Sequence, residues 1–80
     1  MAENLVFMHD PAHGWLRVPL SMIEGETYSD YSYFNGRYAY LEEDCDMTRF
    51  LLNHTEVDTE QVDTRYFDSR EAFLAEVRHG

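Results

Sequence analysis

With 80 residues the chain fits one small domain, 1–80, whose core must be thin, because a chain this short buries only about 60% of its unfolded surface. Sixteen Asp and Glu stand against six Arg and no Lys, which gives a formal net charge of −10. This charge repels nucleic acid and anionic membranes and attracts basic surfaces, so it argues against direct nucleic-acid binding and predicts a basic protein partner.

The single cysteine and the N-terminal sequence bear on the compartment. Cys45 excludes an intrachain disulfide and a multi-cysteine zinc site, which favours a reducing environment. We expect Cys45 to be a small core residue, with a reactive thiol as the alternative. The N-terminus lacks a signal-peptide pattern, and no segment approaches the ~20 apolar residues of a membrane span. We therefore expect a cytoplasmic protein without membrane contact, and a monomer.

The first part of the chain predicts two short strands and a turn of helix. Residues 5–8 and 15–18 are apolar runs separated by the turn-rich segment 9–14, as is typical of two antiparallel strands. Pro19 and the apolar residues after it favour one or two helical turns that end at Gly25.

The dipeptide Asn35-Gly36 predicts a β-hairpin. Residues 31–34 and 37–41 flank it, and Asn-Gly supplies the positive φ angles of a two-residue type I′ turn. Alternation along these strands gathers aromatic side chains on one face. We expect this face to be a tyrosine ladder made of Tyr31, Tyr33, Tyr38 and Tyr40.

The remaining chain predicts two helices and a strand. Acidic residues at 42–46 precede an apolar pattern over 47–52, which predicts a helix with acids at its N-terminal end. A strand over 62–66 follows, and Asp68 with Glu71 fits a capping box that opens a last helix. The predicted fold is α+β, with an antiparallel sheet of four to five strands and both main helices on one face.

Patterns that would indicate catalysis are missing from the sequence. It contains no nucleophile elbow and no phosphate-binding glycine loop, so we expect no enzyme and no cofactor. His9, Asp10 and His13 have a spacing that suits a divalent cation, but Pro11 and Gly14 place them in a turn. A metal-dependent enzyme centred there is the least favoured alternative.

Two acidic stretches are the candidate partner-binding residues. The acids at 42–46 are explained by the dipole of the helix that follows, whereas those at 56–63 precede no predicted helix. In extended backbone, Glu56, Asp58 and Glu60 would share one face at intervals of roughly 6.7 Å, comparable with phosphates along a DNA strand. The candidate residues are Glu42, Glu43, Asp44, Asp46, Glu56, Asp58, Glu60 and Asp63, with Tyr33 and Tyr38 as aromatic contacts.

Three segments carry a resemblance to known proteins. They are His9-Asp10-Pro11 with His13-Gly14-Trp15-Leu16, then Tyr31-Ser32-Tyr33, then Tyr40-Leu41-Glu42-Glu43-Asp44-Cys45-Asp46. Together they resemble an uncharacterised family of small phage and plasmid proteins. The size and acidity of the chain also resemble those of phage anti-CRISPR proteins that act on type I surveillance complexes, subtype I-C among them.

This resemblance implies a function by mimicry. It implies a stoichiometric inhibitor that mimics DNA and binds the basic DNA-recognition surface of a surveillance-complex subunit. The alternative is a protein-interaction or toxin-neutralising module that docks through the tyrosine face.

Overall fold

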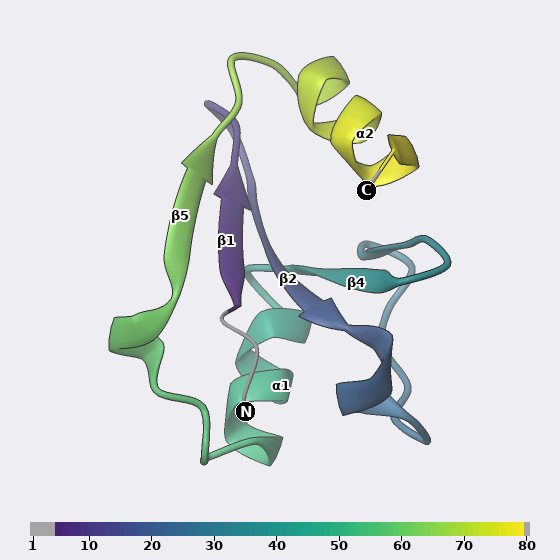
Figure 1. The fold of residues 1–80 in the computed structure, drawn as a ribbon, viewed down its shortest axis with the longest axis vertical. Helices are drawn as coiled ribbons and strands as arrows, with labels where there is room; N and C mark the ends of the chain where they lie inside the picture. The colour runs from purple at the N-terminus through teal and green to yellow at the C-terminus, as the bar shows by residue number, and fades with distance from the viewer. Residues whose placement is uncertain (1–4, 80) are drawn as a thin grey trace.

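The fold, seen in a computed structural model that describes residues 5–79, is a single five-stranded sheet with two helices (Figure 1). The strand order is β3-β4-β2-β1-β5. The strands are β1 (Val6–His9), β2 (Gly14–Pro19), β3 (Tyr33–Phe34), β4 (Tyr38–Glu42) and β5 (Asp63–Tyr66). The helices are α1 (Asp46–Asn53) and α2 (Arg70–His79), with short 3-10 helices η1 (Leu20–Ile23) and η2 (Thr59–Gln61). The predicted α+β class is confirmed. No helix within the described range is long and apolar enough to cross a membrane.

The sheet is mixed, whereas the sequence predicted an antiparallel one. Strands β1 to β4 pair antiparallel, but β5 runs parallel to β1 at the edge of the sheet. A parallel neighbour needs a long crossover rather than a hairpin. The segment from α1 to η2 returns the chain to the end of the sheet where β1 starts, and it carries the chain from β4 to the opposite edge.

The two helices cover opposite faces of the sheet, so the predicted single helical layer is wrong. Trp15 packs in one cluster with Phe73 of α2, while the next residue, Leu16, packs in another with Phe50 of α1. Successive strand residues point to opposite faces. Consecutive apolar residues in a strand are typical of a sheet buried on both sides, and β2 has this pattern.

The turn between β3 and β4 is not the predicted type I′ turn. No non-glycine residue among those described has a positive φ angle, and Gly25 is the glycine that does. Asn35 instead pairs with Tyr38, and its Oδ1 accepts hydrogen bonds from the N–H groups of Arg37 (2.8 Å) and Tyr38 (2.7 Å). Its Nδ2 donates to the carbonyl oxygen of Val77 (2.7 Å), so this side chain ties the hairpin to α2.

Helix α2 begins one residue later than the predicted capping box. Ser69 Oγ accepts a hydrogen bond from the N–H of Ala72 (3.1 Å), which is the role that the sequence assigned to Asp68. The ring of Phe73 stacks on Trp15 with centroids 3.9 Å apart and an angle of 11°. This stack packs α2 on the sheet, and Val77 of α2 belongs to the same buried cluster.

Candidate functional site

The acidic stretch after α1 does not lie in an extended strand. Asp58 is the N-cap of the 3-10 helix η2, and its Oδ1 accepts a hydrogen bond from the N–H of Glu60 (3.0 Å). The backbone there is helical and not extended. The predicted spacing of Glu56, Asp58 and Glu60 along one strand face is therefore wrong. All three remain exposed, and Asp63 is exposed at the start of β5.

Asp46 is buried and cannot contact a partner. Its side chain lies at the start of α1 with 0% exposure. Its Oδ2 accepts hydrogen bonds from Ser29 N–H (2.9 Å), Ser29 Oγ (2.7 Å) and Ser32 Oγ (2.6 Å). Burial would raise the pKa of Asp46, but the hydrogen bonds from Ser32 and Ser29 outweigh it and lower the pKa below its usual value. Asp46 therefore holds the loop before β3 against α1.

The other acids of this cluster differ in exposure. Glu42 is half-buried, and its Oε1 accepts from the N–H groups of Asp44 and Cys45, both at 3.1 Å. Glu43 is also half-buried, whereas the Asp44 side chain is exposed. Cys45 is exposed, so its predicted place in the core is wrong. Asp44 is thus the most accessible carboxylate before α1.

The tyrosine ladder lies mainly under α2. Tyr40 is fully buried, and its strand partner Tyr33 is half-buried against Phe73. Tyr38 is half-buried as well, with Arg17 stacked over its ring at 4.5 Å. Tyr31, the fourth residue of the predicted ladder, lies before β3 and is 75% exposed. The predicted tyrosine face is therefore core at Tyr40 and open to solvent at Tyr31.

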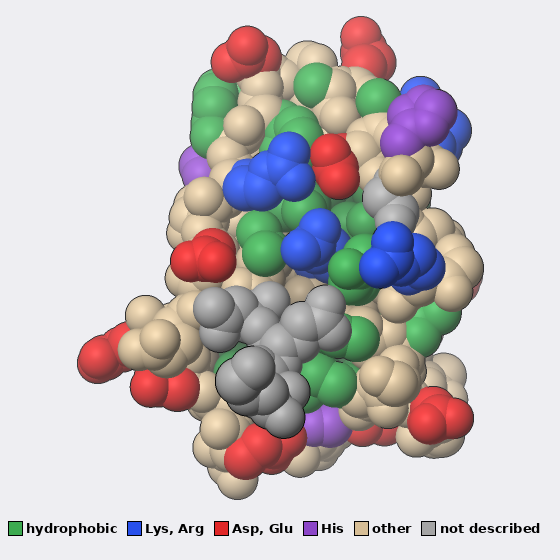
Figure 2. All heavy atoms as spheres, viewed as in Figure 1, with side chains coloured by type: hydrophobic (Ala, Val, Ile, Leu, Met, Phe, Trp, Pro, Cys, Tyr) green, Lys and Arg blue, Asp and Glu red, His purple; other side chains and the backbone are tan. Residues whose placement is uncertain are grey.

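On the face shown in Figure 2, the arginine side chains and most of the carboxylates lie in different regions of the surface. In the view of Figure 2, Arg side chains lie across the middle of the molecule and carboxylates lie mostly at its margins. Several Arg side chains are engaged by aromatic rings: Arg17 and Arg37 lie over Tyr38, and Arg65 lies over Phe67. The exposed acids near η2 consequently have few cations beside them.

The group around Asp10 forms a turn. Asp10 Oδ1 accepts from the N–H groups of Ala12 (2.8 Å) and His13 (2.7 Å), and Oδ2 accepts from Arg70 Nε (3.3 Å). Burial opposes ionisation, but these hydrogen bonds and the guanidinium lower the pKa of Asp10 below its usual value. The ring of His9 packs against Tyr66. Within residues 5–79, no group of three His, Cys, Asp or Glu side chains is placed to hold a metal ion.

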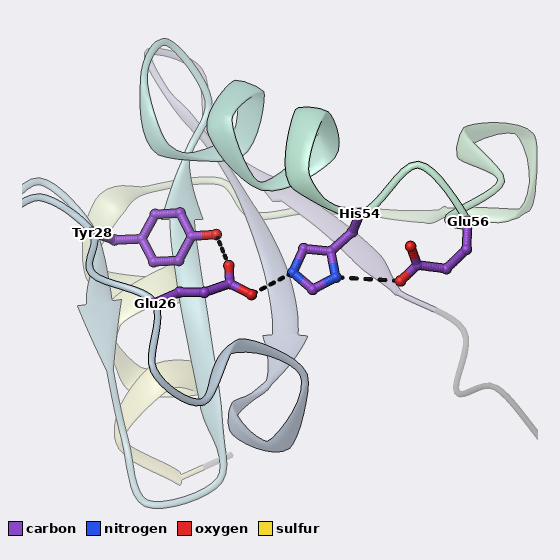
Figure 3. A network of polar contacts seen from close by, with 4 residues as sticks. All are labelled: Glu26, Tyr28, His54 and Glu56. Carbon is purple, nitrogen blue, oxygen red and sulfur yellow. Dashed lines mark hydrogen bonds and ion pairs between the residues drawn. The ribbon is translucent and has the colours of Figure 1, made fainter.

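A carboxylate-histidine-carboxylate network lies at the end of α1 (Figure 3). His54 Nε2 lies 2.6 Å from Glu26 Oε2, and its Nδ1 lies 3.2 Å from Glu56 Oε2. The Tyr28 hydroxyl donates to the other oxygen of Glu26 at 2.5 Å. Burial would lower the pKa of His54, but hydrogen bonds to the two carboxylates outweigh it and raise the pKa. This network could not be predicted from the sequence, because Glu26 lies 28 residues before His54 and only Glu56 is close to His54 along the chain.

An apolar hollow lies beside β5. It has a volume of about 310 Å³ and opens between α1, η2 and the β1–β5 pair. Its lining residues are Phe7, Leu16, Met47, Leu51, Thr59, Val62 and Thr64. Exposed acids at 58–63 flank it, so apolar and acidic surfaces meet at this edge of the sheet.

Comparison with known proteins adds no relative. No family model, no curated protein and no solved structure matches the chain. The functional inference therefore depends on the exposed carboxylates and on the surface around β5.

Proposed function

We propose that the chain is a non-enzymatic inhibitor that binds the basic DNA-recognition surface of another protein, with a subunit of a type I CRISPR surveillance complex as the partner. The observation that carries this proposal is a set of exposed acids without cations. Among the described residues, no Arg or His nitrogen lies within 4.0 Å of a carboxylate oxygen of Asp44, Asp58, Glu60 or Asp63. Unpaired carboxylates repel one another, and a basic partner relieves that repulsion.

A DNA-binding groove supplies the matching chemistry. Arg and Lys side chains line such a groove and neutralise the phosphates of DNA. This binding releases the counterions that were condensed on the DNA. Exposed carboxylates carry the same charge as phosphates and can pair with those Arg and Lys side chains without lying on a regular strand. The acids that support this role are Asp44, Asp58, Glu60 and Asp63. Asp46 is removed from the set because it is buried, and Glu56 because it is paired with His54.

The experiment is a displacement assay. Purified protein is titrated into a type I surveillance complex that holds labelled target DNA, at low and at high salt. The test variant combines Glu60→Lys with Asp63→Lys, because neither carboxylate accepts a hydrogen bond from the described residues. Glu56 and Asp58 are left intact, since His54 and the N–H of Glu60 depend on them.

A matched control has the same net charge. Glu24→Lys with Asp30→Lys changes two exposed acids in the segment that links η1 to β3, which Figure 1 shows on the other side of α1 from η2. The wild type and the control should displace DNA, and the test variant should need at least about ten-fold more protein. Equal displacement by all three proteins would contradict the role of these acids. No association of the wild type with the complex would contradict the partner.

A further inference from the structure

We propose that the free edge of β5 is the docking site, where an extended basic segment of the partner adds to the sheet as a sixth strand. This inference rests on the proposed function for the basic character of the partner. It goes further by naming the edge, the mode of binding and the pattern of side chains that fits.

The main chain of β5 has hydrogen-bonding groups that point away from the sheet. The N–H of Asp63 donates to the carbonyl of Leu5 (3.0 Å), and the N–H of Phe67 donates to the carbonyl of His9 (2.8 Å). Alternate residues of a strand direct their N–H and C=O groups to opposite sides. Thr64 and Tyr66 therefore point theirs outward, and within residues 5–79 no strand pairs with β5 on that side.

This edge has few of the features that block strand addition. β5 pairs with β1 in unbroken register over its four residues and contains no Pro, and its one cation, Arg65, is paired with Glu76 Oε1 (3.4 Å). Natural edge strands are shielded by proline, charged side chains, bulges, very short length or a covering element. All four β5 residues are exposed, whereas the opposite edge strand, β3, has only two residues. β5 is thus the longer and more open edge.

The apolar hollow supplies a pocket for a side chain of the added strand. Thr64 lines the hollow, so a residue paired with Thr64 would place its own side chain over it. The ring of Tyr66, 57% exposed, points to the same face of the strand. Main-chain pairing gives affinity in such complexes, and pockets for alternate side chains give specificity.

Charge selects the occupant. Glu60 and Asp63 lie at the start of β5, and Asp68 lies just past its end, all exposed. If two copies of the chain paired antiparallel through Thr64 and Tyr66, Arg65 of one copy would face Arg65 of the other. Like charges that face each other destabilise a pair of strands, so a second copy is disfavoured. The segment that fits has Arg or Lys opposite Asp63 and near Asp68, an uncharged residue opposite Arg65, and apolar residues opposite Thr64 and Tyr66.

The first test uses a capped pentapeptide, Arg-Val-Thr-Val-Arg, which places its Thr opposite Arg65 and has the same sequence in either strand direction. Its control is the same peptide with the amides of one edge N-methylated, which keeps the charge but removes the pairing N–H groups. Calorimetry should show that the unmodified peptide binds the wild type at least about ten-fold more tightly, the gain expected from two net hydrogen bonds. Amide NMR shifts should concentrate at Thr64 and Tyr66. Equal binding of the two peptides would overturn the proposal.

The second test changes the protein. Thr64→Pro removes an N–H that points outward and keeps the hydrogen bonds between β5 and β1. Edge strands tolerate proline at such a position. Thr64→Val keeps the N–H and is the matched control. The unmodified peptide should bind the valine variant like the wild type and the proline variant at least about ten-fold more weakly. If the proline variant fails to fold, the methylated-peptide comparison on the wild type still decides the question.

The two proposals fail separately. If the wild type and the folded Thr64→Pro variant displace DNA equally from the surveillance complex, the edge is wrong and the proposed function stands. If the wild type does not displace DNA but binds the unmodified peptide selectively, the proposed function is wrong and the edge stands. A β5-mediated dimer of the wild type in sedimentation experiments would overturn the choice of occupant.

Discussion

At the scale of single residues, Asp46 is the carboxylate on which local folding depends most. It accepts three hydrogen bonds from Ser29 and Ser32 in a buried site. We expect Asp46→Ala to lower the free energy of unfolding by about 2–4 kcal/mol, because it leaves these donors unpaired. Denaturant unfolding at pH 7 measures this, with Asp44→Ala as an exposed control that should change it by less than about 0.5 kcal/mol. A small loss for Asp46→Ala would show that water replaces the carboxylate.

His54 should make stability depend on pH in the neutral range. Because its pKa is raised in the folded state, its contribution is complete below the unfolded value of ~6.5 and is lost as pH rises through the folded pKa. The free energy of unfolding should fall over that range, and His54→Gln should flatten the decline. In an NMR titration, Glu26→Gln should lower the pKa of His54, since it removes a contact of 2.6 Å. An unchanged pKa would contradict the network.

These residues also show what the sequence could predict about the site. The sequence shows the excess of acids and the absence of lysine, and most of the carboxylates that were candidates for partner binding are exposed in the structure. The burial of Asp46 was not readable, because it depends on serines that lie far away in the sequence. The contact between Glu26 and His54 has the same origin.

At the scale of elements, the turn before β4 depends on Asn35 rather than on glycine. We expect Asn35→Ala to reduce the free energy of unfolding by about 1–3 kcal/mol, since the N–H groups of Arg37 and Tyr38 and the carbonyl of Val77 lose their partner. Gly36→Ala should change it by less than about 0.5 kcal/mol, because the space around a new Cβ is open and φ is not positive. A type I′ turn would instead make the glycine substitution cost about 1 kcal/mol or more. Thermal unfolding of both variants decides between the two turns.

The existence of most helices and strands was predictable from the sequence, but the face of the sheet that each helix covers was not. Apolar alternation and turn residues located the strands and both main helices, because these signals are local. The face that a helix covers is decided by partners from distant segments, as Phe73 shows by packing on Trp15. Consecutive apolar pairs such as Trp15-Leu16 and Tyr40-Leu41 were the available sign that both faces are buried.

At the scale of the whole molecule, self-repulsion should make the fold sensitive to salt. The net charge is −10, and in the described part of the chain Asp44, Asp58, Glu60 and Asp63 have no Arg or His nitrogen within 4.0 Å. The Debye length falls to ~10 Å at 0.1 M salt, so added NaCl should raise the melting temperature by a few degrees. The combined Glu60→Lys and Asp63→Lys variant should gain less, because it starts with less repulsion. A melting temperature that falls with salt would contradict this account.

The parallel pairing of β1 with β5 has a consequence for synthesis of the chain. β1 is synthesised well before β5, so on the ribosome the apolar strand Val6–His9 has one side uncovered until β5 emerges. Long-range pairing of this kind is slow, and an uncovered apolar strand is prone to aggregate. A chain cut short before Asp63 would lose the cover of β1 and should aggregate as it is produced.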